Sequence, residues 1–122
     1  KLDNDNKLNQ TKFLDAINII KNNFQKISNL ATNNNANLYL VIFPWPETLI
    51  NGQSEFNWEK FAFNLCVKSN CNKLINVFPK FRKIKEEKKN WLNHLYLPYD
   101  IHLTIEGNTI IADEITNNIF FK

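Results

Sequence analysis

The sequence is short of glycine, cysteine and methionine, and it has no long apolar run. In 122 residues it contains two glycines, two cysteines and no methionine. Two cysteines without partner ligands do not form a zinc site. No apolar run reaches the length of a membrane-spanning helix, and no stretch has the pattern of a signal peptide. The missing methionine and the start at Lys1 lead us to expect a piece of a longer protein.

Apolar and aromatic residues, by contrast, are frequent enough to form a core. They make up 43% and 13% of the chain, which is typical of a globular protein and not of a disordered tail. The net charge of +3 is mild, so we expect no nucleic-acid partner. The lysines of residues 83–89 are interleaved with Glu86 and Glu87, as on a solvated helix face. The many asparagines and lysines indicate an AT-rich genome, which concerns origin and not function.

The spacing of apolar residues predicts a long helix followed by a buried strand. Between residues 8 and 31 the apolar positions recur every three or four residues, as on one helix face. Residues 38–43 form a short continuous apolar run, which is typical of a buried strand in a parallel sheet. Pro44 ends this strand because proline cannot donate a ladder hydrogen bond. Helix, short loop and buried strand in this order predict a doubly wound α/β sheet.

The same pattern continues in the middle of the chain. Residues 48–55 are polar and predict a loop, and Asn57 is a candidate cap for the helix after it. Residues 74–78 predict a second buried strand, which Pro79 stops. A partly exposed helix should follow up to about Leu95. It contains His94, which we interpret as a surface or half-buried histidine.

Asp100 and His102 form a candidate catalytic pair. In an extended loop, side chains two residues apart point to the same side, so the carboxylate and the imidazole can meet. A carboxylate that accepts the Nδ1 proton fixes the tautomer and stabilises the imidazolium formed when Nε2 acts as a base. The structural alternative is a turn acid followed by a histidine that precedes a helix.

Thr104 and Gly107 predict how the last helix begins. Thr104 is placed to cap it, with Ile105 as its first residue. Gly107 lies one turn further on, where glycine costs about 1 kcal/mol of helix propensity relative to alanine. That cost indicates close packing of the helix against a neighbouring backbone.

The order of these segments resembles the SGNH (GDSL-type) hydrolases over about residues 10–120. The stretch DIHLTIEGNTIIADEI resembles the last conserved block of that family. LYLVIFPWPE resembles its late strand and following loop, CNKLINVFPKF its last strand, and WLNHLYLPYD the approach to the histidine. Many members place the acid three residues before the histidine, where this chain has Tyr99. Here Asp100 stands two before it, as in envelope-polysaccharide members of the wider group.

The resemblance implies a three-layer α/β/α fold with a mostly parallel, flavodoxin-like sheet. Residues 1–122 would be the C-terminal portion of a single SGNH hydrolase-like domain, incomplete at its N-terminus. His102 would be the general base and Asp100 the acid that orients it, with no metal or organic cofactor. The Gly-Asp-Ser block and the oxyanion glycine and asparagine of the family are absent. The nucleophile should therefore come from the missing N-terminal part, and residues 1–122 alone are expected to be inactive. The serines present, none in the family's context, are Ser28, Ser54 and Ser69.

The implied activity is hydrolysis or transfer of an acyl group, above all acetyl, on an oxygen of a carbohydrate or other small ester. Trp45 and Glu47 follow the first predicted strand, where α/β sheets gather ligands, so Trp45 could stack on a sugar. The simpler interpretation is that Trp45 covers the sheet end and Glu47 is solvated. A non-catalytic SGNH-like module that binds glycans or a protein is the second hypothesis, and Trp45 and Trp58 would then matter more than His102.

Cys66 and Cys71 leave two interpretations open. They are five residues apart, from a helix end into a turn, and could form a small disulfide outside the cytoplasm. A buried free Cys66 is the interpretation that we favour slightly. The cell envelope or periplasm is the compartment that the resemblance favours.

Overall fold

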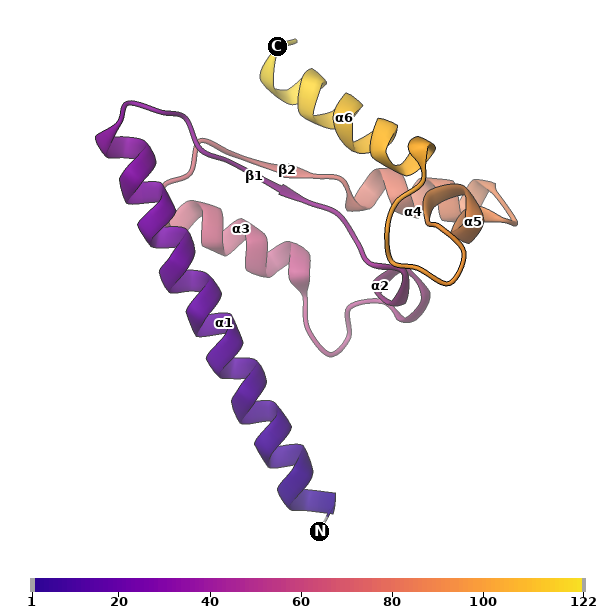
Figure 1. Cartoon of the computed structure of the whole chain (residues 1–122), viewed down its shortest axis with the longest axis horizontal. Helices are drawn as coiled ribbons and strands as arrows, with labels where there is room; N and C mark the ends of the chain where they lie inside the picture. Colours follow the sequence, from indigo (N-terminus) through magenta and orange to yellow (C-terminus); the bar gives the residue numbers. More distant parts are fainter. Residues whose placement is uncertain (1, 122) are drawn as a thin grey trace.

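The computed structural model describes residues 2–121, which form six helices and two short strands (Figure 1). The predicted strands, the long first helix and the C-terminal helix are confirmed, with shifts of a few residues at their ends. No helix within the described residues has both the length and the apolar character needed to cross a bilayer. In chain order the elements are α1 (Leu2–Asn33), β1 (Tyr39–Ile42), α2 (Pro46–Asn51), α3 (Trp58–Lys68), β2 (Lys73–Asn76), α4 (Phe78–Glu87), α5 (Trp91–Leu95) and α6 (Ile105–Ile119).

The predicted three-layer α/β/α fold with a mostly parallel sheet is wrong for these residues. The sheet has two strands, β1 and β2, and the domain is mostly helical. The two strands are parallel, with Tyr39 opposite Lys73 and Ile42 opposite Asn76. Only two segments of this chain have the continuous apolar pattern of a buried strand, and the remaining apolar residues recur at helical spacing. That residues 1–122 belong to a larger domain stays a prediction.

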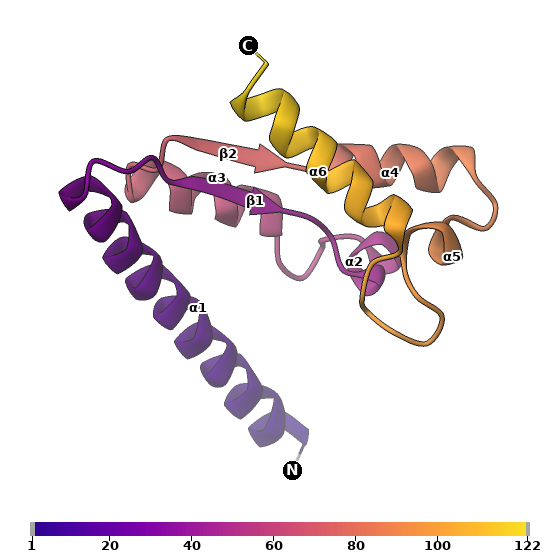
Figure 2. The same ribbon diagram turned by 45° about the horizontal axis from the view of Figure 1, so that its top comes forward.

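The strands lie between helices on two sides. α1 and α3 lie on one side of β1 and β2, and α6 lies on the other (Figures 1 and 2). The buried core surrounds β2 and the segments that follow it. α6 completes it with half-buried isoleucines. The buried members of the core are Leu49, Ile75, Val77, Phe81, Leu95 and Tyr96.

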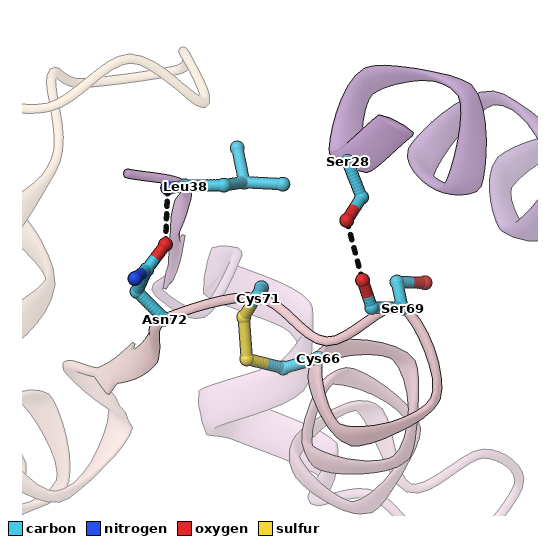
Figure 3. The surroundings of a disulfide bond; sticks show 6 residues. All are labelled: Ser28, Leu38, Cys66, Ser69, Cys71 and Asn72. Atoms are coloured by element: carbon cyan, nitrogen blue, oxygen red, sulfur yellow. Dashed lines mark hydrogen bonds between the residues drawn. A yellow bond between two sulfur atoms is a disulfide. The ribbon is translucent and has the colours of Figure 1, made fainter. Parts of the chain in front are cut away.

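Helix α1 contacts the domain through one narrow face. Ile17 and Ser28 are buried on that face and Phe24 is half-buried, at the helical spacing predicted from the sequence. The Ser28 hydroxyl donates to the carbonyl oxygen of Ser69 (Figure 3). The amino-terminal end of α1 projects away from the rest of the chain (Figures 1 and 2).

Two helical segments differ from the sequence prediction. Residues 46–51 form helix α2 within the predicted loop, because Pro46 suits a first helical turn and Leu49 is buried. The single helix expected up to Leu95 is divided into α4 and α5, and α4 ends where Lys88 is extended. Asn57 caps α3 as predicted, accepting the backbone N–H of Lys60 at 2.9 Å.

Cys66 and Cys71 form a disulfide, so the free Cys66 that we favoured is wrong (Figure 3). The bond closes the turn between α3 and β2, where Asn70 has a φ of 56°. That left-handed residue reverses the chain and brings the two Cα atoms within 4.9 Å. Just after the turn, the Asn72 side chain accepts the backbone N–H of Leu38 at 2.6 Å. The disulfide therefore lies beside the point where the two strands begin to pair.

Candidate functional site

Asp100 and His102 contact each other directly. His102 Nδ1 lies 2.6 Å from Asp100 Oδ1, and the same oxygen accepts the backbone N–H of His102 at 3.1 Å. The predicted meeting of carboxylate and imidazole is confirmed, but it occurs in an Asx turn and not in an extended loop. Hydrogen bonds from the backbone and side chain of His102 lower the pKa of Asp100 from its usual value. A charged carboxylate at this position accepts the Nδ1 proton and leaves Nε2 with its lone pair.

The loop that carries the pair is short and closed. The backbone N–H of Asp100 donates to the carbonyl of Leu97 at 3.1 Å, with Pro98 second and Tyr99 at a φ of 58°. This is the pattern of a type II turn, in which glycine is the usual third residue. At the base of the loop, the Leu97 N–H donates to the His102 carbonyl at 2.9 Å. The backbone therefore holds Asp100 and His102 close together.

A buried tyrosine connects this loop to the segment that follows β1. The Tyr96 hydroxyl donates to the carbonyl oxygen of Pro44 at 2.7 Å, and Tyr96 is 1% exposed. Burial raises the pKa of Tyr96 well above its usual value, so the hydroxyl stays a donor. The sequence analysis missed this residue, although a buried tyrosine hydroxyl generally has a partner.

Thr104 and Gly107 fix the other end of the loop, as predicted. Thr104 accepts the backbone N–H of Gly107 at 3.1 Å and donates to the carbonyl of His94 at 2.5 Å. Gly107 is buried, and a Cβ atom there would lie 2.5 Å from the carbonyl oxygen of Leu95. The start of α6 is therefore packed directly on the backbone of α5. The half-buried His94 side chain lies 3.1 Å from Lys88 Nζ and takes no part in this contact.

The catalytic candidates lie on the surface. The His102 side chain is 77% exposed and that of Asp100 is 44% exposed. No serine hydroxyl within residues 2–121 contacts His102, and the Ser28 hydroxyl is bound to Ser69 beside the disulfide. The described residues thus contain an oriented base without a nucleophile.

Trp45 and Glu47 line an apolar pocket of about 630 Å³ beside β1. Its volume falls in the range of small-molecule sites. Glu47 is its single charged lining residue within the described chain, and Trp58 forms part of the opposite wall. Trp45 follows Pro44, whose carbonyl binds the hydroxyl of Tyr96, the residue before the loop of His102, so one hydrogen bond connects the two segments. The sequence analysis did not anticipate that Ile20 of α1 borders the same pocket.

Side chains suited to metal binding are not clustered. Within residues 2–121, no group of three or more His, Cys, Asp and Glu side chains could hold a metal ion. Comparison of the chain with protein-family models, with curated proteins and with solved structures found no match.

Proposed function

We propose that this chain supplies the general base and its orienting acid to a serine esterase or O-acyltransferase. The substrate class is an acetyl or other small acyl ester of a carbohydrate or small molecule. The contact of 2.6 Å between His102 Nδ1 and Asp100 Oδ1 carries this proposal. The serine and the oxyanion donors come from the N-terminal part of the same domain, outside residues 1–122.

The reaction requires two proton transfers at His102. Nε2 takes the serine proton while the serine oxygen bonds to the acyl carbon, and the carboxylate of Asp100 stabilises the imidazolium. When the carbon–oxygen bond to the alcohol breaks, Nε2 returns the proton to the leaving oxygen. Water, or a second alcohol in the transferase case, then attacks the acyl-serine with the same help.

The open position of the pair fits a site completed by further chain. At 77% exposure, water weakens the electrostatic effect of Asp100 on His102. Covering the loop would exclude water and strengthen that effect. The exposed apolar side chains of Leu97 and Ile101 belong to the same loop and offer a surface for such a cover.

The pocket beside β1 is the proposed place for the substrate. Trp45 is 57% exposed at its rim, where an aromatic face can stack on a sugar ring, and Glu47 can accept hydrogen bonds from sugar hydroxyls. The same exposed aromatic surface favours the second candidate function, a non-catalytic module that binds glycans or a protein. In that case Trp45 and Trp58 carry the function and His102 does not.

The test uses the polypeptide encoded by the gene together with its upstream sequence. With p-nitrophenyl acetate, His102→Ala should lower kcat/KM by roughly 10³-fold or more, and Asp100→Asn by about 10²-fold or more. His94→Ala is the matched control and should stay within about threefold of the unchanged protein, because the contact of its side chain is with Lys88 and not with the pair. Turnover that survives His102→Ala contradicts the esterase proposal, and glycan binding lost in Trp45→Ala would then support the binding module.

A further inference from the structure

Strand β1 is paired along one edge. The carbonyl of Leu38 accepts the N–H of Asn72 at 2.7 Å, and the carbonyl of Ile42 accepts the N–H of Val77 at 2.9 Å. Both bonds point toward β2. Backbone groups alternate in direction along a strand, so those of Leu40 also point toward β2.

The opposite edge of β1 is open. By the same alternation, the backbone groups of Tyr39, Val41 and Phe43 point away from β2. No other strand within residues 2–121 pairs with this edge. Unpaired N–H and C=O groups at strand spacing are a template for one further strand.

The space beside the open edge is apolar. The pocket of about 630 Å³ is lined there by Val41 of β1, by Phe43 directly after β1, by Ile20 of α1 and by Trp58 of α3. Two large aromatic side chains beside it are partly exposed, Phe43 at 41% and Trp58 at 37%. A strand at this edge would bury these side chains against its own apolar residues.

The apolar face of α1 is only partly covered within the described chain. Ile20, Ile27 and Leu30 recur at helical spacing and are 41%, 50% and 63% exposed. These residues adjoin the buried residues Ile17 and Ser28 on the same helix. Since Ile20 also borders the pocket, the exposed part of this helix face and the open strand edge form one continuous surface.

The handedness of the connections between parallel strands indicates which strand fits this edge. The chain passes from β1 through α3 to the parallel strand β2, and α1 lies on the same side of the strands as α3 (Figures 1 and 2). Connections between parallel strands are almost always right-handed. A strand leading into α1 with that hand lies parallel to β1 at its open edge.

We propose that the open edge of β1 and the apolar pocket beside it hold one further strand, parallel to β1 and leading into α1 in a longer polypeptide. Its backbone pairs with Tyr39, Val41 and Phe43. Because it is parallel to β1, its carboxyl end lies at the end of β1 that precedes Trp45. The proposal rests on topology and burial and does not depend on the chemistry of Asp100 and His102.

Amide hydrogen exchange in the polypeptide with its upstream sequence tests this. The amides of Tyr39, Val41 and Phe43 should exchange at least 100-fold more slowly than in an unstructured chain, as should that of Ile42, which faces β2. Ile20→Lys should speed exchange at the three edge amides at least tenfold and leave Ile42 unchanged. The matched control is Ile19→Lys, which lies next to it on α1, is 59% exposed and does not border the pocket.

Three results would overturn the proposal. The edge amides could exchange as in an unstructured chain while the Ile42 amide is protected. Their protection could disappear on dilution, which would assign the edge to a second copy. The gene could encode no strand ahead of α1. Each is read without an activity assay, so it is distinguishable from failure of the esterase proposal.

Discussion

Gly107 is the residue at which the smallest change should have the largest effect. A Cβ atom there would lie 2.5 Å from the Leu95 carbonyl oxygen and 3.1 Å from the Leu103 side chain. Because the nearer obstacle is backbone, Gly107→Ala should lower the free energy of unfolding by about 2 kcal/mol, despite the gain in helix propensity. Urea denaturation measures this. Thr109→Ala, exposed on the same helix, should change it by about 0.5 kcal/mol at most; equal stability of both variants would disprove the close contact.

The contact between Asp100 and His102 was predictable because it is local, and the close packing of Gly107 was indicated by the cost of a glycine within a helix. Side chains two residues apart in a turn lie close enough for a carboxylate and an imidazole to bind each other. A capping threonine followed three residues later by a glycine indicates a tightly packed helix start. The exposure of the pair was not predictable. It depends on which parts of the chain cover the loop, and spacing along the sequence contains no information about that. The same limit applies to Tyr96, whose partner Pro44 is 52 residues away.

The turn between α3 and β2 depends on its disulfide. Replacing both cysteines by serine should lower the free energy of unfolding by about 2 kcal/mol, the chain-entropy value for a loop this small. Denaturation of the unchanged protein with and without a reducing agent should show the same difference, and the double variant should not respond to the reducing agent. Two titratable thiols in the denatured, unreduced protein would show that the bond does not form.

At the level of elements, the periodicity of apolar residues predicted the long helices and the strands and missed a short helix that depends on one proline. The apolar spacing gave α1, β1, β2 and α6. It missed α2, because residues 48–55 were interpreted as a polar loop although Pro46, just before them, suits a first helical turn. The resemblance and the order of helix, loop and strand both predicted a wide sheet, which is wrong for residues 2–121, because only two segments there pair as strands.

Across the whole molecule, Glu59 connects more segments than any other charged group described. Both of its oxygens bind Arg82 of α4, at 2.7 and 3.1 Å. Gln53, from the loop before α3, and Asn76, at the end of β2, each donate to it at 2.7 Å. The Arg82 hydrogen bond is the main reason that the pKa of Glu59 is lowered from its usual value. Helix α3 is thereby linked to α4 and to the end of the sheet.

This network should make stability depend on acid pH in a defined direction. Because the pKa of Glu59 is lower in the folded than in the unfolded chain, the stabilisation is fully present above the unfolded value of about 4.5 and is lost as the pH falls through the folded value. Glu59→Gln should lower the free energy of unfolding by roughly 1–2 kcal/mol at pH 7, and the gap to the unchanged protein should narrow below pH 4.5. Glu55→Gln, exposed in the loop before α3, should stay within about 0.5 kcal/mol at every pH. If the difference in unfolding free energy between Glu59→Gln and the unchanged protein stays constant below pH 4.5, the charge of Glu59 does not stabilise these contacts. Packing and neutral hydrogen bonds would then account for the stability.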